Sequence, residues 1–207
     1  FLSGGDTVFS NKLSFTITSI GFTNNITYRN KAKVNDDIYV SGNLGDSYLG
    51  LLVLKNKIKL NHLLSNYFTN QYFMPNIQLK LVDQIKKFAN TSIDISDGLL
   101  ADLDKMINSQ KLSYKLDLKK IPISNNMKMV LNLKKLPKIN YISNGDDYQV
   151  LFTAAKYKRA VIQRISSNYR IKLTKIGSIQ RAAIKPSIVD EKNMEIRPQN
   201  KGYFHKF

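Results

Sequence analysis

Carboxylates gather at a few places along this chain, although acidic residues are scarce in it. The 207 residues include 15 Asp and Glu against 32 Lys and Arg. Seven of the acidic residues fall in three short segments, namely Asp6; Asp94, Asp97, Asp102 and Asp104; and Asp146 and Asp147. Because like charges repel, this clustering on a cationic chain indicates a site for a cation. The chain has no Cys and only two His, so the expected cation is a hard one held by oxygen atoms, such as Mg²⁺.

The segment 92–100 (SIDISDGLL) combines two carboxylates with the start of a helix. Asp94 ends a predicted strand and Asp97 opens a helix three residues later, so both carboxylates can face one crevice at the edge of a sheet. The N–H groups at the helix N-terminus suit a phosphate, and Ser96 adds a hydroxyl beside them. A second interpretation stays open at this point: Ser96 or Asp97 caps the helix, and Asp94 is solvated.

Two glycine-bearing segments hold the remaining carboxylates. Gly4-Gly5-Asp6-Thr7 precedes a predicted strand; its glycines let the backbone approach a ligand closely, and Asp6 could hold a metal ion. Residues 145–148 (GDDY) likewise precede a strand. Since Asp and Gly favour turns, each segment alone is equally compatible with an ordinary turn.

Three other charged residues allow simpler interpretations. Arg29 is one of only six Arg residues, and its planar guanidinium could bind phosphate or form a surface salt bridge. Asp102 and Asp104 lie inside the helix that begins near Asp97, and we expect them to face solvent.

The net charge of +17 raises the alternative of a nucleic-acid-binding surface. Of the 32 basic residues, however, 26 are Lys, and they are spread along the whole chain. Nucleic-acid readers favour Arg and cluster their charge, so no nucleic-acid partner is expected. The longest strongly apolar run, residues 48–54, is far shorter than the roughly 20 residues that span a bilayer. We therefore expect a cytoplasmic protein without a membrane partner.

Hydrophobic periodicity and turn residues predict a chain in which strands and helices alternate. The predicted strands are 13–22, 37–40, 92–95, 114–118, 148–154, 171–179 and 182–189. The predicted helices are 48–54, 62–73, 77–88, 97–107 and 157–167, and residues 42–47 read as a tight strand-to-helix connection. The fold class is therefore α/β or α+β.

Taken in order, several segments resemble one family. They are GGDT at 4–7, Arg29, the stretch DDIYV at 36–40, GNLGDS at 42–47, IDISDGLLADL at 93–103, GDDYQVLFT at 145–153 and GYFH at 202–205. The pattern covers nearly the whole chain and resembles the thiamine-monophosphate kinases of the aminoimidazole-ribonucleotide-synthetase-like superfamily. Residues 93–103 are its most specific part and argue against other ATP-dependent enzymes of that superfamily.

The resemblance implies transfer of the ATP γ-phosphoryl group to thiamine monophosphate, with Mg²⁺ as cofactor and no catalytic side-chain nucleophile. By position it assigns nucleotide binding to Gly5, Asp6, Arg29 and Ser96. It assigns metal binding to Asp6, Asp94 and Asp97, and substrate binding to Asp146 and Tyr203. Four departures from the family pattern bear on substrate affinity. Asp146 stands where the family usually has Glu, and Asn144 replaces a glycine. Residues 29–32 (RNKA) replace the usual Arg-Ser-Gly-Ala, and Gln149 replaces a usual Glu.

The resemblance also implies two parts of the chain. Residues 1–30 would be the C-terminal remnant of an N-terminal ATP-binding domain, ending in the strand 13–22, and residues 31–207 a synthetase-like C-terminal domain of mixed sheet and helices. The full-length protein would be a homodimer. Because the chain begins with Phe1 and lacks most of the first domain, the alternative is a truncated, non-catalytic remnant that binds only nucleotide or thiamine phosphate.

Overall fold

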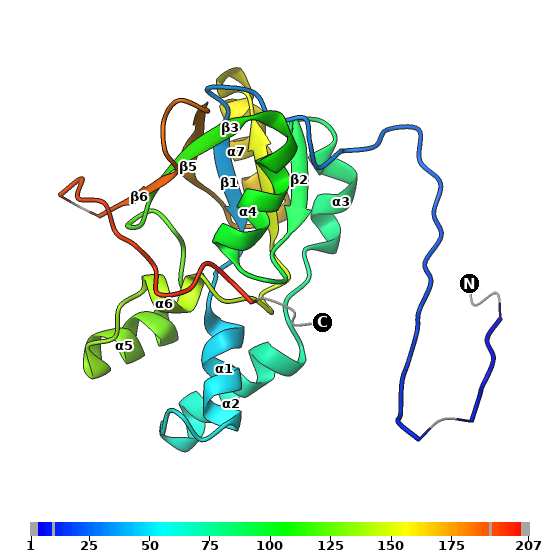
Figure 1. Cartoon of the computed structure of the whole chain (residues 1–207), viewed down its shortest axis with the longest axis vertical. Coiled ribbons are helices and arrows are strands. Elements are labelled where there is room, and N and C mark those ends of the chain that lie inside the picture. Colours follow the sequence, from blue (N-terminus) through cyan, green and yellow to red (C-terminus); the bar gives the residue numbers. More distant parts are fainter. Residues whose placement is uncertain (1–3, 10, 191, 204–207) are drawn as a thin grey trace.

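A computed structural model describes residues 4–9, 11–190 and 192–203 (Figure 1). Its centre is a six-stranded sheet in the order β2-β4-β1-β5-β3-β6. The strands are β1 (Asp37–Ser41), β2 (Thr91–Asp94), β3 (Leu112–Asp117), β4 (Val150–Ala154), β5 (Leu173–Arg181) and β6 (Ser187–Val189). β3 and β6 run parallel and the other neighbouring strands run antiparallel, so the sheet is mixed, in agreement with the predicted fold class.

Helices cover both faces of the sheet. The side chains of β1 alternate between two hydrophobic clusters, because successive residues of a strand point to opposite faces. Ile38 and Val40 pack with α4 (Leu99–Ile107) on one face, and Tyr39 packs on the other with α3 (Leu79–Ile85) and α7 (Arg159–Tyr169). All five residues of β1 are buried, as expected of a central strand covered on both sides.

A second group of helices packs at one end of the sheet (Figure 1). It consists of α1 (Asp46–Leu54), α2 (His62–Phe73), α5 (Asn125–Lys134) and α6 (Ile139–Ile142), around a cluster that includes Leu49, Phe68 and Met127. α2 has the predicted bounds, but α5 and α6 were not predicted. In α5, the side chain of Ser124 caps the helix by accepting the N–H of Met127 at 3.0 Å.

Several predicted elements have other bounds in the structure. The helix predicted over 77–88 is shorter, since α3 covers Leu79–Ile85 and is followed by a turn. The strand predicted over 182–189 is reduced to β6, after a turn that follows Arg181. The helix predicted over 97–107 begins at Leu99, and α7 is preceded by a short 3₁₀ turn over Lys156–Lys158. Within the part of the chain that the structure describes, no helix has the length and apolar character needed to cross a membrane.

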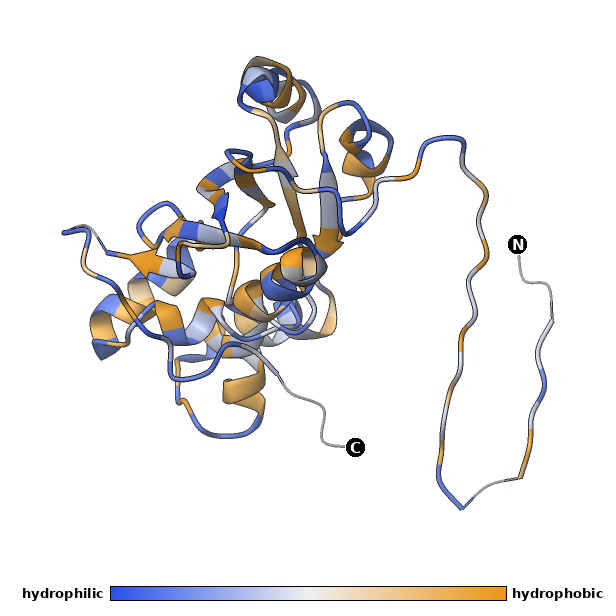
Figure 2. Ribbon diagram, turned by 45° about the horizontal axis from the view of Figure 1, so that its top comes forward, coloured by the Kyte–Doolittle hydropathy of each residue, from blue (hydrophilic) through white to orange (hydrophobic). Residues whose placement is uncertain are grey.

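The strand expected over residues 13–22 is not found. This part of the chain is extended but pairs with no other strand among the described residues, and it runs apart from the body (Figures 1 and 2). Its apolar side chains face solvent, with Leu13 87% and Phe22 99% exposed. Alternation can specify which face of a strand is buried, but hydrogen bonds to a neighbouring strand are needed to form one. The body begins near Tyr28, whose carbonyl accepts hydrogen bonds from Thr91 and Ser92 of the edge strand β2.

Candidate functional site

The turn between β2 and α4 is organised by a buried carboxylate. Oδ2 of Asp102 accepts hydrogen bonds from the backbone N–H groups of Ser96, Asp97 and Gly98, at 3.0, 2.9 and 3.0 Å. The expectation that Asp102 faces solvent was therefore wrong, because Asp102 is only 1% exposed. The finding also changes the expected phosphate site, because these three N–H donors are bonded to a side chain of the same helix.

A second loop, residues 143–148, packs tightly against this turn. The N–H of Asp146 donates to the carbonyl of Ser96 at 2.9 Å. A β-carbon on Gly145 would overlap that carbonyl oxygen and lie 2.6 Å from the carbonyl carbon of Ser96, and one on Gly98 would overlap the carbonyl oxygen of Ser143. Gly98 also has a φ of 127°, which other residues rarely adopt. Both glycines are thus required for the approach of the two loops.

The second loop contains two residues in the left-handed backbone region. Asp146 has a φ of 66° and Tyr148 a φ of 49°. Non-glycine residues with positive φ are uncommon, and strained backbone is concentrated at functional sites. The bond from Tyr148 N–H to the carbonyl of Ile95, at 2.9 Å, helps to hold this conformation.

The C-terminal segment completes the arrangement. The N–H of Tyr203 donates to the carbonyl of Asp97 at 2.8 Å, and the N–H of Ala101 donates to the carbonyl of Lys201 at 2.9 Å. Tyr203 is thereby placed beside the β2–α4 turn, although about 100 residues separate them in the sequence.

These segments enclose an open cavity of about 610 Å³, within the usual range of small-molecule sites. Its polar side chains include Ser96, Asp97 and Asp146. Four tyrosines from α1, α2, the second loop and the C-terminal segment add aromatic surface, and Lys55 is the basic residue among those lining the cavity. The lining residues are Tyr48, Leu51, Lys55, Tyr72, Ser96, Asp97, Asn144, Gly145, Asp146, Tyr148 and Tyr203.

The two carboxylates that line the cavity interact electrostatically. Burial, and then the negative charge of Asp97, raise the pKa of the Asp146 carboxyl, while Lys55 opposes the rise. Asp97 is also paired with Lys105, which donates to Asp102 Oδ1 at 2.9 Å. A cation bound at Asp97 would reduce the repulsion between the two cavity carboxylates and favour the charged form of Asp146. Carboxylates beside a hydroxyl are suitable ligands for a hard cation that also binds phosphate oxygens.

Of the residues predicted from the sequence, the structure brings together Ser96, Asp97, Asp146 and Tyr203. Asp94 ends β2 as predicted, but it is exposed and does not line the cavity.

The other predicted nucleotide residues lie elsewhere. Gly5 and Asp6 are in the N-terminal segment that precedes the body, and Arg29 is exposed directly after Tyr28, whose carbonyl bonds to the edge strand β2. Among the described residues, no group of three or more His, Cys, Asp or Glu side chains is placed to hold a metal ion. The three-aspartate metal site formed by Asp6, Asp94 and Asp97 therefore stays a prediction.

Sequence reasoning missed Tyr48, Lys55, Tyr72 and Tyr148. The first three lie on or directly after helices whose orientation toward the cavity depends on how α1 and α2 pack. No spacing between them and the carboxylates points to a shared site. Only Tyr148, which follows Asp147 in the predicted segment 145–148, offered a signal.

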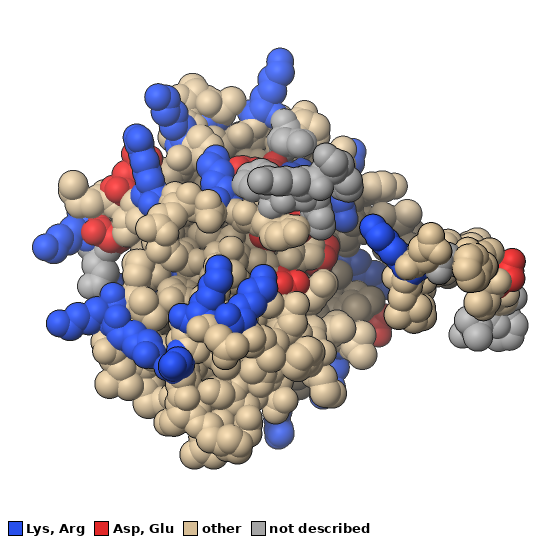
Figure 3. All heavy atoms as spheres, turned by 60° about the horizontal axis from the view of Figure 1, so that its bottom comes forward, with Lys and Arg blue, Asp and Glu red and all other residues tan. Residues whose placement is uncertain are grey.

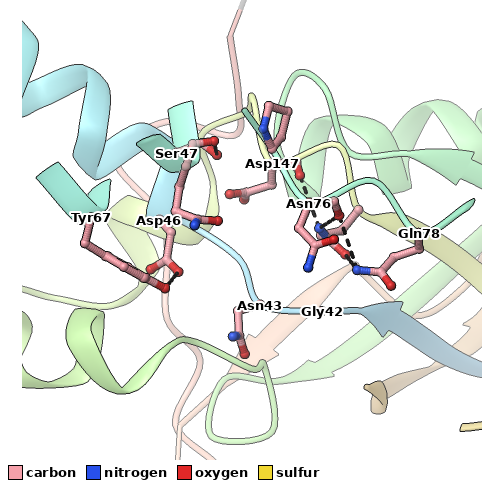
Figure 4. Close-up of a pocket in the computed structure, with 11 residues that line it drawn as sticks. Gly42, Asn43, Asp46, Ser47, Tyr67, Asn76, Gln78 and Asp147 are labelled. Atoms are coloured by element: carbon pink, nitrogen blue, oxygen red, sulfur yellow. Dashed lines mark hydrogen bonds between the residues drawn. The ribbon is translucent and has the colours of Figure 1, made fainter. Parts of the chain in front are cut away.

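A second, smaller cavity of about 210 Å³ lies beside the turn that connects β1 to α1 (Figure 4). Its carboxylates already have partners: Asp46 accepts from the hydroxyls of Tyr67 at 3.0 Å and Ser124 at 2.7 Å, and Asp147 Oδ2 accepts the N–H of Gly45 at 2.8 Å. Burial raises the pKa of both carboxyls. These bonds hold the turn between strand and helix, as predicted for residues 42–47.

On the molecular face shown in Figure 3, Lys and Arg side chains are spread over the surface and acidic side chains occupy a few positions. This distribution agrees with the sequence, in which basic residues occur along the whole chain.

Comparison with known proteins gives a consistent set of relatives, although no family model matches the chain. It is 33% identical over 182 residues to the thiamine-monophosphate kinase of Buchnera aphidicola from Acyrthosiphon pisum, covering 86% of the chain and 55% of the relative. It is 30% identical over 193 residues to that of Aquifex aeolicus, covering 93% of the chain and 60% of the relative. The chain thus spans little more than half the length of the curated relatives that it matches.

Solved structures agree. AaThiL complexed with AMPPCP and TMP matches with a TM-score of 0.70 and 28% identity, covering 88% of this chain and 55% of that one. Thiamine-monophosphate kinase from Stenotrophomonas maltophilia K279a matches with a TM-score of 0.68 and 26% identity, covering 80% of this chain and 52% of that one. HypE of E. coli has a TM-score of 0.63 at 14% identity, over 87% of this chain and 54% of that one, which shows a shared fold alone.

Proposed function

We propose that this chain, a homologue of thiamine-monophosphate kinases over most of its length, takes part in the ATP-dependent phosphorylation of thiamine monophosphate to thiamine diphosphate. The observation that carries the proposal is the cavity in which Ser96 and Asp97 meet Asp146 and Tyr203. The resemblance assigns the first pair to the nucleotide and metal side of a kinase site, and the second pair to the substrate side.

The residues present fit a magnesium ion. Mg²⁺ in phosphoryl-transfer sites is commonly held by one or two carboxylates together with phosphate oxygens and water, so it needs no complete protein cage. Asp97, with Asp94 at the other end of the same turn, would hold the ion. When bound, Mg²⁺ neutralises charge on the phosphates that react.

The other side of the cavity suits thiamine monophosphate. The carboxyl of Asp146 can bond to an aminopyrimidine, and Tyr203 can lie against an aromatic ring. The positive charge of a thiazolium ring is attracted by the faces of tyrosines and by nearby carboxylates. Asp146 is one methylene shorter than the usual Glu of the family, so the contact to the substrate must differ in length.

Direct transfer of a phosphoryl group asks the protein mainly to align two phosphates and to balance their charge. No side chain has to act as a nucleophile, and we assign no catalytic residue. The work of this chain is to bind, orient and partly desolvate the reacting groups in the cavity.

The proposal also divides the chain. Residues 1–30 would belong to an ATP-binding domain, which contributes Gly5, Asp6 and Arg29, and residues 31–207 would form the second domain. The exposed apolar side chains of residues 13–22 would then be covered by other strands of the first domain, in a cytoplasmic homodimer. Light scattering tests this part: the 207-residue chain should self-associate, and a stable monomer would contradict it.

A second candidate function is binding without turnover. It is favoured by the lining of the cavity, which does not include Gly5, Asp6 or Arg29. Two assays separate the candidates. Calorimetry with AMPPCP, with and without Mg²⁺, and with thiamine monophosphate measures binding, and chromatographic detection of thiamine diphosphate measures turnover. Binding with product supports the kinase, binding without product supports the second candidate, and absence of binding by a folded sample contradicts both.

A further inference from the structure

The Asp102 carboxylate has more partners than a surface helix residue needs. Oδ2 accepts the three N–H groups of Ser96, Asp97 and Gly98, and Oδ1 accepts from Lys105 at 2.9 Å. Successive N–H groups that converge in this way form an anion-binding concavity at the N-terminus of a helix. Here the anion is a side chain from the first turn of that helix, α4.

The backbone carbonyls of Ser96 and Asp97, in the same turn, bond to the two other segments that line the cavity. The carbonyl of Ser96 accepts the N–H of Asp146 at 2.9 Å, and the carbonyl of Asp97 accepts the N–H of Tyr203 at 2.8 Å. Because each peptide unit is planar, holding the N–H groups of the turn limits the directions in which its neighbouring carbonyls can point. The two residues on the substrate side are therefore anchored to the turn that Asp102 holds.

Lys105 connects Asp102 directly to the cavity. Its ammonium group pairs with both Asp97 and Asp102, and it lies one helical turn after Asp102. Asp102 therefore contacts Asp97 by two routes. Its Oδ2 accepts the backbone N–H of Asp97, and its Oδ1 binds the lysine that pairs with the Asp97 carboxylate.

From these contacts we propose that Asp102 is a positioning residue, whose buried carboxylate sets the geometry in which Ser96, Asp97, Asp146 and Tyr203 face one cavity. The identity of the ligand in this inference rests on the proposed function. The role of Asp102 in the geometry of the turn does not. Partners at this distance from a metal ligand commonly change metal affinity 10–100-fold when they are mutated.

The test compares Asp102→Asn with Asp83→Asn in the 207-residue chain. Asp83 is an exposed carboxylate on α3, so its variant makes the same change of charge away from the cavity. Two quantities are measured: amide hydrogen exchange at residues 96–98, followed by NMR, and the Kd for AMPPCP with Mg²⁺. We expect Asp102→Asn to speed exchange of these amides about tenfold or more and to weaken Mg²⁺-dependent binding by about tenfold.

Other outcomes overturn the inference. Unchanged exchange at residues 96–98 would show that Asp102 does not hold the turn, and equally faster exchange throughout β4 would show that it serves only stability. Faster exchange in the turn with an unchanged Kd would show that the geometry of the turn does not affect ligand binding in the cavity. If Asp102→Asn does not fold, Asp102→Glu keeps the charge, displaces it by one methylene, and should give the same two effects to a smaller extent. A wild-type chain that binds no nucleotide contradicts the proposed function, whereas amide exchange still decides the role of Asp102 in the turn.

Discussion

Replacing Gly145 with Ala tests how closely the two loops of the candidate site approach each other. A β-carbon at this position would overlap the carbonyl oxygen of Ser96 and lie 2.6 Å from its carbonyl carbon and 2.9 Å from that of Asp97. All three are backbone atoms, so no side-chain rotation can relieve the contact. Because carbon atoms pack at about 3.5–4.0 Å, the loops would have to separate by roughly 1 Å.

The expected cost follows from two contributions. Overpacking of a tight contact typically costs about 1–3 kcal/mol. Separation of the loops also weakens the bond from Asp146 N–H to the Ser96 carbonyl, at a further cost of about 1 kcal/mol. The free energy of unfolding should therefore fall by about 2–4 kcal/mol, which corresponds to a fall in Tm of about 5–15 °C for a chain of this length.

Urea unfolding followed by circular dichroism measures this change, and Gly21→Ala is the matched control. A β-carbon on Gly21 would have no atom within 4 Å, so its midpoint should equal that of the wild type. The Gly145→Ala variant should also bind AMPPCP less tightly, because the loop carrying Asp146 moves relative to Asp97. If Gly145→Ala and Gly21→Ala unfold at the same urea concentration, the packing of the two loops described here is incorrect.

Three other substitutions address single charges. Asp97→Asn should weaken Mg²⁺-dependent binding of AMPPCP tenfold or more, since it removes the carboxylate proposed to hold the metal ion; an unchanged Kd in calorimetry would reject that role. Asp146→Ala should raise the Kd for thiamine monophosphate more than that for AMPPCP. The reverse order would show that the proposed placement of the substrate beside Asp146 is wrong. Burial lowers the pKa of Lys138 to about 8, with Asp117 opposing the shift. The unfolded chain then keeps a proton that the folded chain has released, so stability should rise between about pH 8 and pH 10.5. Urea unfolding should show this rise in the wild type and a smaller rise in Lys138→Met. An NMR titration of the Lys138 side chain with a midpoint near 10.5 would refute the prediction.

Some of the structure could be predicted because local patterns specify it. The β-branched and aromatic run at 37–40 forms β1, and α2 spans the predicted 62–73, where Asn61 supplies the cap by accepting the N–H of Leu64. The carboxylates of residues 93–103 were found because acidic residues are rare elsewhere in this chain. In each case the cause lies within a few residues of the effect.

The role of Asp102 shows how a local pattern can be present and still be misread. Asp102 lies three residues after Leu99 and four before Met106, so helical spacing puts it on the buried face of α4. A carboxylate on that face is expected to be solvated unless several donors are available to it. The N–H groups of residues 96–98 supply those donors only after the turn has folded back over the helix.

The cavity itself depended on contacts between distant segments. Tyr203 reaches the site because its N–H bonds to the Asp97 carbonyl, and Tyr72 does so because α2 packs on α1, where Gly50 lets the helices approach. Conversely, residues 13–22 alternate like a strand but stay unpaired in the described chain, since a strand needs a neighbour that the local sequence does not contain. The sequence by itself determined which residues could do the chemistry. Only the tertiary structure decided which of them meet, because hydrogen bonds and packing between remote segments depend on how the whole chain closes.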